Sequence, residues 1–259
     1  MFLEKIITAK RKEISEKEKE IPLEVLKNGI KSTKPVKSIK RAIAKDKMSI
    51  IAEIKKSSPS LGIIREDFCP KDLATDYEKN GADAISVLTE KNFFLGDESH
   101  LVEVKRNVGI PVLRKDFIIS EYQIYQSRMI GADAILLIAN CLSRDEIYRF
   151  LCTAHSIDLE CIVEVHNEDD IKKIKELEFD VIGINNRNLD TFNVNLNTSF
   201  ILKDLLPENA VVISESGIKS LDDIKSLANK GFRGVLIGEL FMRSQSPGEK
   251  LKSLIEGLS

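Results

Sequence analysis

The feature that most constrains the fold is a repeated pattern in which a helix-like segment ends in glycine and leads directly into a short apolar run. The clearest pair of copies is Asn80–Leu88 (Asn-Gly-Ala-Asp-Ala-Ile-Ser-Val-Leu) and Ile130–Ile138 (Ile-Gly-Ala-Asp-Ala-Ile-Leu-Leu-Ile). Glycine is common just past the end of a helix, and buried parallel strands are continuously apolar. The same order recurs at Phe179–Ile184 and Gly231–Gly238. The chain is therefore predicted to consist of repeated helix–strand units.

Eight apolar runs of this kind follow one another at intervals of roughly 20 to 35 residues, which leaves room for a crossover helix between each pair. The runs are Ile50–Ile54, Ala84–Leu88, Ile110–Leu113, Ala134–Ile138, Cys161–Val165, Val181–Ile184, Val211–Ser214 and Val235–Ile237. Parallel strands that alternate with helices in this number predict a closed (β/α)8 barrel, a TIM barrel. The alternative is an open doubly wound sheet, but no Gly-rich dinucleotide fingerprint follows the first run.

The segment before the first strand has a different pattern, because apolar residues such as Ile6 and Ile14 recur there at helical spacing among Lys and Glu. We expect an N-terminal helical extension over residues 1–47, within a single domain that spans residues 1–259. The basic cluster Lys10–Lys12 is interpreted as a solvated helix face, since acidic residues follow at once.

The composition narrows the class of partner. The chain has 259 residues, of which 42% are hydrophobic and 31% charged, and its 39 basic residues are interspersed with 41 acidic ones for a net charge of −2. This balance argues against nucleic acid or an anionic membrane surface as the main partner. No apolar run approaches the ~18 residues of a membrane span.

Cysteine and histidine usage gives further bounds. The four cysteines show no Cys-x-x-Cys spacing, and the N-terminus lacks the apolar stretch of a signal peptide, so we expect free thiols in a reducing cytoplasm. His100, His155 and His166 are scattered along the sequence, so no metal site is expected.

Polar side chains stand at or just after the ends of most of the predicted strands, where barrel enzymes place their catalytic groups. In the first of these strands Glu53 and Lys55 point to the same face, because side chains alternate along a strand. A structural ion pair or a loop cap explains any one of these polar residues, whereas a shared site explains all of them together. They are Glu53, Lys55, Lys115, Glu164, Asn185, Arg187, Glu215, Ser216, Gly217 and Gly238.

The last two strand ends indicate an anion. Ser216-Gly217 opens the seventh loop, and Gly238 precedes a short helix predicted over Glu239–Arg243. Glycine lets backbone N–H groups approach a ligand, and a helix N-terminus favours negative charge, so this corner of a barrel is the usual phosphate seat. Arg187 would add a bidentate contact. Each glycine taken alone is equally consistent with a tight turn.

Four motifs are specific in combination: Ile51–Ser60 (Ile-Ala-Glu-Ile-Lys-Lys-Ser-Ser-Pro-Ser), Leu113–Phe117 (Leu-Arg-Lys-Asp-Phe), Ile184–Leu189 (Ile-Asn-Asn-Arg-Asn-Leu) and Ser214–Gly217 (Ser-Glu-Ser-Gly). They closely resemble the motifs of the indole-3-glycerol phosphate synthase family of tryptophan biosynthesis, and the resemblance covers essentially the whole chain. The resemblance implies closure of 1-(2-carboxyphenylamino)-1-deoxyribulose 5-phosphate into an indole with loss of carbon dioxide and water. It also implies that no metal and no organic cofactor is needed.

The resemblance assigns roles to residues by motif. The implied catalytic set is Glu53, Lys55, Lys115, Glu164, Asn185, Glu215 and Ser216. The implied substrate contacts are Ser58, then Phe93 and Phe117 in an aromatic pocket, and Arg187, Gly217, Gly238 and Glu239 at the phosphate. A phenylalanine in a barrel loop is more often plain packing.

Two positions depart from the family pattern. Gly96-Asp97 stands where the family often shows Gly-Ser. Glu239 stands where some members have serine, so only its backbone N–H is expected to help and its carboxylate is expected to turn away.

The chemistry of such a reaction suggests roles for the charged groups. Lys115 fits a general acid for ring closure, because an ammonium can donate its proton as charge develops on a carbonyl oxygen. Lys55, paired with Glu53, fits binding of the substrate carboxylate, and Glu164 fits a group that steadies Lys115.

Two other functions are compatible with these residues. One is a lyase that forms a Schiff base through Lys55 or Lys115. Another is a phosphometabolite-binding protein without turnover. The expected partner is a small phosphorylated substrate, with other tryptophan-pathway enzymes as further candidates and a monomer as the expected state.

Overall fold

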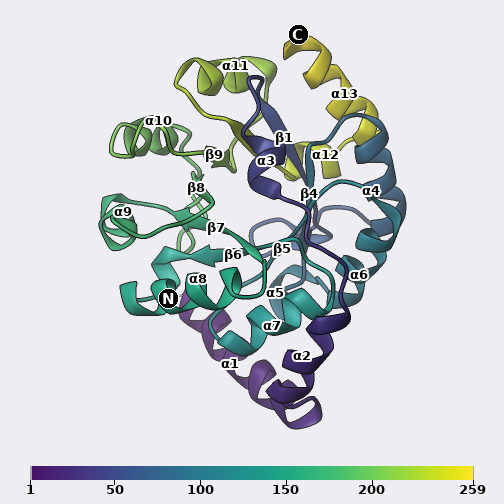
Figure 1. The fold of residues 1–259 in the computed structure, drawn as a ribbon. Coiled ribbons are helices and arrows are strands. Elements are labelled where there is room, and N and C mark those ends of the chain that lie inside the picture. The colour runs from purple at the N-terminus through teal and green to yellow at the C-terminus, as the bar shows by residue number, and fades with distance from the viewer. Residues whose placement is uncertain (1, 259) are drawn as a thin grey trace.

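A computed structural model describes residues 2–258 of the chain and shows a closed barrel of eight parallel strands surrounded by helices (Figure 1). The strands are hydrogen-bonded in the order β1-β10-β9-β8-β7-β6-β5-β4, and β4 pairs with β1 to close the barrel. Their bounds are β1 (Ser49–Ile54), β4 (Ala84–Leu88), β5 (Val112–Lys115), β6 (Ala134–Ile138), β7 (Glu160–Val165), β8 (Val181–Asn185), β9 (Val212–Glu215) and β10 (Gly234–Ile237). The predicted (β/α)8 barrel is confirmed.

Two strands lie further along the chain than expected. β5 begins at Val112 rather than Ile110, because Pro111 has no N–H to donate to the ladder, and its register with β4 continues to Lys115. β9 runs to Glu215, which pairs with Asn185 of β8. Lys115 and Glu215 are therefore the last residues of their strands, held by the barrel's own hydrogen bonds.

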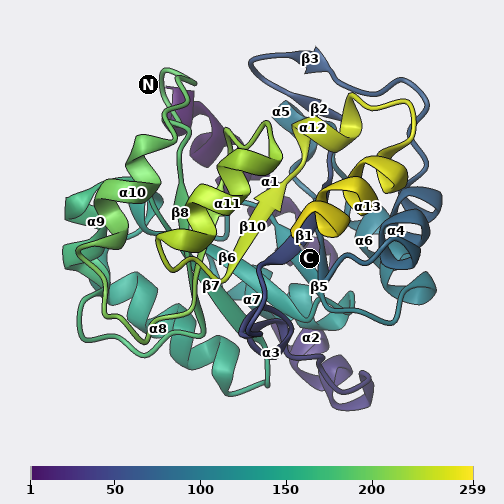
Figure 2. The same cartoon turned by 90° about the horizontal axis from the view of Figure 1, so that it is seen from above.

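Eight longer helices follow the strands in turn. They are α4 (Pro70–Lys79), α6 (Glu98–Asn107), α7 (Glu121–Met129), α8 (Arg144–His155), α9 (Glu168–Ile174), α10 (Asn197–Lys203), α11 (Leu221–Asn229) and α13 (Pro247–Leu258). Short elements lie after the strands: the hairpin β2 (Ser57–Ser58) and β3 (Gly62–Ile63), α5 (Lys91–Phe94), the 3-10 turn η2 (Ala139–Cys141) and α12 (Glu239–Met242). In Figure 2 the hairpin, α5 and α12 gather at the upper end of the barrel, where the strands finish.

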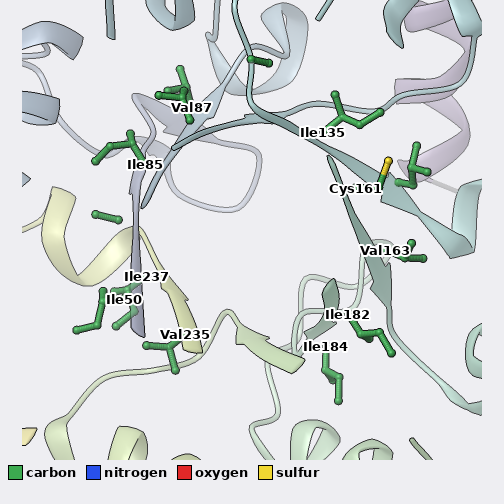
Figure 3. Close-up of a cluster of buried hydrophobic side chains, with 14 of the residues drawn as sticks. Ile50, Ile85, Val87, Ile135, Cys161, Val163, Ile182, Ile184, Val235 and Ile237 are labelled. Atoms are coloured by element: carbon green, nitrogen blue, oxygen red, sulfur yellow. The ribbon is translucent and has the colours of Figure 1, made fainter. Parts of the chain in front are cut away.

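Strand alternation divides the buried apolar side chains into two layers. Figure 3 shows Ile50, Val163 and Ile184 among the side chains that point outward from the ring of strands toward the helices. Residues of the opposite register, such as Ile51 and Ile162, form a second buried cluster inside the barrel. Both faces of each strand are therefore apolar along most of its length, as expected for a parallel sheet that is covered on both sides.

The N-terminal extension is helical, as the sequence predicts. Its described residues form α1 (Phe2–Glu20), α2 (Leu23–Gly29), the 3-10 turn η1 (Ile30–Ser32) and α3 (Ile39–Ile43). Helix α3 closes the end of the barrel at which the strands begin. Its Ile39 and Ile43 are fully buried in the inner cluster, and the hydroxyl of Ser49 at the start of β1 donates to the carbonyl oxygens of Ala42 and Ile43. Within residues 2–258 no helix has the length and apolar character needed to cross a membrane.

Helix α1 lies at the opposite end, and one interpretation of its sequence is wrong. Lys10 is 1% exposed, and its ammonium lies 3.0 Å from Asp116 and 2.8 Å from Glu13. Arg11 and Lys12 are exposed, so the solvated face is correct for them alone. Lys10 is buried because it shares the face of Ile6 and Ile14, four residues away in each direction.

The repeated Gly-Ala-Asp pattern joins neighbouring strands where they begin. Asp83 accepts a hydrogen bond from the backbone N–H of Ile50 at 2.9 Å, and Asp133 accepts one from Val112 at 2.8 Å. Asp180, before β8, accepts one from Cys161 at 2.9 Å. Each carboxylate thus satisfies a backbone donor that the ladder leaves free.

Candidate active site

A cavity of about 650 Å³ opens at the carboxyl end of the barrel, and all eight strands contribute residues to its wall. The charged and polar side chains at its base stand on neighbouring or facing strands, as the sequence predicts. Those of the predicted set that line it are Glu53, Lys55, Ser58, Lys115, Phe117, Glu164, Asn185, Arg187, Glu215, Ser216, Gly217, Gly238 and Glu239. Barrel closure therefore brings all the predicted site residues except Phe93 to one cavity.

The centre of the cavity is an ion cluster of one lysine and two carboxylates. The ammonium of Lys115 donates to Oε2 of Glu164 at 2.6 Å and to Oε2 of Glu215 at 2.8 Å. Both carboxylates are 1% exposed. Oε1 of Glu215 is buried and has no hydrogen-bond partner within residues 2–258. A lysine shared by two carboxylates, one of them incompletely satisfied, is suited to moving protons.

The three groups differ in how readily they hold a proton. Burial opposes the charged form of Lys115, but the carboxylates of Glu164 and Glu215 outweigh it and hold its pKa well above the usual value. Burial likewise opposes ionisation of Glu164, yet the positive charge of Lys115 holds the pKa of this carboxyl far below its usual range. For Glu215 burial and the negative charge of Glu164 prevail over Lys115 and raise the pKa to about 7. The pair of carboxylates therefore takes up one proton near neutral pH, chiefly on Glu215.

A second ion pair stands beside this cluster, formed by Glu53 of β1 and Lys55 just after the end of that strand. Lys55 donates to Oε2 of Glu53 at 2.5 Å, and the side chains are 17% and 5% exposed. Both face the cavity, as the alternation of β1 predicts. The ammonium of Lys55 is thus partly accessible to an anion bound in the cavity.

Two glycines make room for the carboxylates. A Cβ atom on Gly183, in the middle of β8, would collide with the carboxylate of Glu215, and one on Gly238 would collide with that of Glu53. Gly238 was predicted as a site residue because its backbone N–H can approach a phosphate, and the structure adds a steric reason for glycine at this position. Gly183 was missed, although a glycine inside a strand is a signal for a close approach.

The corner between β9 and β10 has the backbone form of an anion seat. Ser216 and Gly217 have φ angles of 65° and 81°, so two successive residues are in the left-handed region. Gly238 is the N-terminal cap of α12. Ser216, Gly217 and Gly238 all line the cavity, so the backbone of this corner is open to a bound anion.

The arginine of this corner already has a partner. A terminal nitrogen of Arg187 lies 3.5 Å from Glu239, whose other carboxylate oxygen lies 3.2 Å from Arg243. The expectation that the Glu239 carboxylate turns away is therefore wrong, because the carboxylate lies beside both arginines. A carboxylate is attracted to the same two cations that would attract a phosphate.

The aromatic wall differs from the expected one. Phe117 lines the cavity together with Phe94 and Phe192, but Phe93 does not. The ring of Phe93 packs against Phe2 of α1 with centroids 5.3 Å apart. Because both phenylalanines lie in one short helix, neighbouring residues point in different directions, and only the position of α1 decides which one faces the cavity.

Other polar neighbours of the predicted site residues were not identified from the sequence. Asn186 holds the β8 and β9 loops together, because its amide donates to the carbonyl oxygens of Glu215 and Ser216 at 2.9 and 3.0 Å. His166 lies beside Glu164 at 3.2 Å. The Asn-Asn pair in the motif Ile184–Leu189 was a possible signal for the contacts of Asn186, whereas nothing in the sequence near His166 predicts its contact with Glu164. The described residues hold no group of three or more His, Cys, Asp or Glu side chains suited to a metal.

The fold and the site together define a (β/α)8-barrel enzyme with a lysine–carboxylate centre at the carboxyl ends of its strands. Comparison with protein families gives a match over residues 3–254 to the model described as indole-3-glycerol phosphate synthase. The chain belongs to the indole-3-glycerol phosphate synthase family.

Relatives of the same name match the chain over its full length. A protein named indole-3-glycerol phosphate synthase from Alkaliphilus metalliredigens (strain QYMF) is 46% identical over 259 residues, which cover 100% of this chain and 99% of the relative. One of the same name from Acetivibrio thermocellus (strain ATCC 27405) is 45% identical over 97% of this chain and 98% of the relative.

Among solved structures, orotidine 5'-phosphate decarboxylase from Pyrococcus horikoshii OT3 superposes with a TM-score of 0.62 at 12% identity. The match covers 81% of this chain and 98% of that one. At this identity the likeness concerns the fold alone.

Proposed function

We propose that this cavity closes the ring of 1-(2-carboxyphenylamino)-1-deoxyribulose 5-phosphate to give indole-3-glycerol phosphate, with Lys115 as the general acid. The protein is a carboxy-lyase of tryptophan biosynthesis by its family. The observation that carries the assignment of Lys115 is its ammonium, fixed between Glu164 and Glu215 at the base of the cavity. Preorganised donors of this kind stabilise charge that develops in the transition state.

In the ring-closing step an aromatic carbon attacks the substrate carbonyl, and the carbonyl oxygen takes up a proton. Lys115 supplies that proton, because the two carboxylates keep it charged throughout the neutral range. Glu215, with a pKa raised to about 7 by burial and by Glu164, is suited to return a proton to Lys115 at neutral pH. Glu164 remains ionised and stabilises positive charge that develops in the aromatic ring.

The substrate carboxylate is assigned to Lys55, whose ammonium is partly exposed at the cavity wall. Glu53 holds that ammonium in place, and the same pair supplies or removes protons when carbon dioxide and then hydroxide are lost. Ser58, whose buried hydroxyl has no partner within residues 2–258, is assigned to substrate contact. Asn185 and Ser216 complete the polar wall, and Phe117 packs against the aromatic ring.

The substrate phosphate is assigned to the corner between β9 and β10, with Arg187 and the backbone N–H groups of Gly217, Gly238 and Glu239 as donors. Arg187 must then exchange the carboxylate of Glu239 for the phosphate. The contact to be exchanged is long, at 3.5 Å, and a bidentate arginine–phosphate pair is the stronger interaction.

We further propose that the chain forms one domain over residues 1–259 and works in the cytoplasm as a monomer. The four thiols, all free, support a reducing compartment. Light scattering of the purified protein measures the oligomeric state, and pull-down with other tryptophan-pathway enzymes tests for partners.

The decisive experiment mixes the purified protein with the carboxyphenylamino-deoxyribulose phosphate and follows indole fluorescence. Steady turnover is expected in buffer treated with chelator. Binding of the substrate without indole formation would favour a phosphometabolite-binding protein. Treatment with borohydride during turnover should leave no adduct on Lys55 or Lys115, and a trapped adduct would favour Schiff-base chemistry.

A further inference from the structure

His166 follows the last residue of β7 and lies next to Glu164, outside the wall of the cavity. Nε2 of His166 is 3.2 Å from Oε1 of Glu164, while Oε2 of the same carboxylate receives the hydrogen bond from Lys115. The imidazole is 8% exposed and is not part of the cavity wall. Glu164 is therefore held by one cationic group on each of its two oxygens.

Asp170, on helix α9, faces the other side of the imidazole. Its Oδ2 lies 3.8 Å from Nδ1 of His166 and accepts the backbone N–H of the same residue at 3.0 Å. Neither ring nitrogen has a well-aligned hydrogen bond within residues 2–258, so both contacts are mainly electrostatic. Two carboxylates around one buried imidazole favour its charged form.

The surroundings contain few other titratable groups. Lys173 of α9 lies 3.6 Å from the second oxygen of Asp170 and donates to the carbonyl oxygens of Ala139 and Leu142. Cys141, in the turn after β6, is a neutral thiol, since burial and the charges of Glu164 and Asp170 raise its pKa. Burial opposes the charge on His166, but Asp170 and Glu164 prevail and raise its pKa to about 9.

We propose that His166 is a positioning residue for the reaction: as an imidazolium it holds Oε1 of Glu164, so that Glu164 stays ionised and keeps Oε2 on the ammonium of Lys115. The inference rests on the proposed roles of Lys115 and Glu164. Comparison of the two carboxylates of the cluster, Glu164 and Glu215, shows what the imidazole of His166 adds. Both are 1% exposed and both bond to Lys115, but Glu164 has a second cation beside it, whereas the second oxygen of Glu215 has no partner.

This difference determines which carboxylate takes the proton that the cluster binds near neutral pH. With His166 charged, the proton goes to Glu215, and Glu164 remains an anion. Without that charge the two carboxylates become similar, so below neutral pH the proton is shared between them and part of the enzyme carries a neutral Glu164. His166 acts through Glu164 and does not touch the substrate.

The first test is titration of the imidazole signals by NMR without substrate, with the His166→Gln variant used for assignment. His166 should remain protonated at pH 7.5. An imidazole that is neutral at pH 7 would refute the proposal. This readout does not depend on turnover, so it is separate from failure of the Lys115 assignment.

The second test is the pH profile of kcat for His166→Gln. We expect a loss of about twofold at pH 6.5, because the shared proton leaves up to roughly half of the enzyme with a neutral Glu164, and no loss at pH 9, where both carboxylates are ionised. A loss of equal size at every pH would show a merely structural role and would refute the proposal. His166→Lys, which retains a positive charge, should recover part of the activity at pH 6.5.

The matched control is His155→Gln, because His155 also pairs with a carboxylate, Asp180 at 2.9 Å, but is 40% exposed and lies on α8 away from the cavity. It should leave the profile unchanged. If His166→Gln does not fold, Asp170→Asn is the alternative test of the proposal, because it removes the negative charge on the other side of the imidazole. It should give a smaller loss that is again confined to low pH, and a flat profile would count against the proposal.

Discussion

The two ends of the barrel use charged side chains in opposite ways. Where the strands begin, Asp83 and Asp133 each accept a backbone N–H from a neighbouring strand and also pair with a lysine. Where the strands finish, Glu164 and Glu215 pair with Lys115 around a cavity and accept no backbone donor among the described residues. The same fold thus holds one set of carboxylates that joins neighbouring strands and another set to which we assign the chemistry.

The two ends of the barrel also differ in whether their buried polar atoms have hydrogen-bond partners. At the beginning of the strands α3 fills the barrel with Ile39 and Ile43, and both oxygens of Asp133 have donors. At the other end the buried hydroxyl of Ser58 and one oxygen of Glu215 have no partner within residues 2–258. Leaving a buried polar group unsatisfied costs roughly 1–3 kcal/mol. Such a cost is expected at a functional site and not at a structural one.

The largest effect that separates the two ends is expected for Lys115→Ala. Removal of a general acid should lower kcat by about 10²–10⁴, with the melting temperature and substrate affinity little changed, because Glu215 can take up a proton in place of the lost charge. The matched control is Lys105→Ala, since Lys105 is 15% exposed and pairs with Asp133 at the opposite end, while Lys115 is 14% exposed. Normal turnover by the Lys115 variant would end its assignment.

Asp133→Ala should have the reverse signature. It leaves the buried N–H of Val112 and that of Lys37 without their acceptor, so we expect a loss of about 3 kcal/mol in the free energy of unfolding. The value of kcat should remain within about twofold of wild type under conditions in which the variant is folded. Urea denaturation and steady-state kinetics measure the two quantities, and a large loss of kcat in the folded variant would contradict the division between the two ends.

Arg187→Ala tests the anion corner. Loss of a charge-assisted contact of about 1.5–3 kcal/mol should weaken binding of inorganic phosphate or of the product by roughly ten- to a hundredfold. Glu239→Gln should act in the opposite direction and tighten phosphate binding by about twofold, because it removes a competing carboxylate. Isothermal titration calorimetry gives both affinities. Unchanged affinity in the first variant would remove Arg187 from the site.

The smallest expected effect is on how the stability of the folded protein depends on pH. The pKa of Glu215 is raised in the folded protein to about 7, so the folded state binds its proton more tightly than the unfolded state does. Stability from this group is therefore present at low pH and is lost as the pH rises from about 4.5 to 7. Glu215→Gln cannot ionise, so its melting temperature relative to wild type should rise by a few degrees between pH 4.5 and 8. Thermal scans at several pH values measure the difference, and a constant difference would show that Glu215 is ionised throughout.

Much of this molecule follows from patterns within one helix–strand unit. The apolar runs, the glycines after helices and the polar residues at strand ends predict the number of strands, the barrel and the end that carries the site. Alternation along β1 places Glu53 and Lys55 in the cavity and Ile50 outside it. These relations span a few residues, and backbone geometry alone determines them.

Only the tertiary structure decides which charges meet. Lys115 contacts Glu164 and Glu215 across separations of 49 and 100 residues, and the closure of the barrel sets those distances. The burial of Lys10 and the exchange of Phe93 for Phe94 at the cavity wall depend on where α1 lies against the barrel. The pKa values of the cluster depend on burial and on charges from other strands, since electrostatic interaction follows distance in space rather than along the chain.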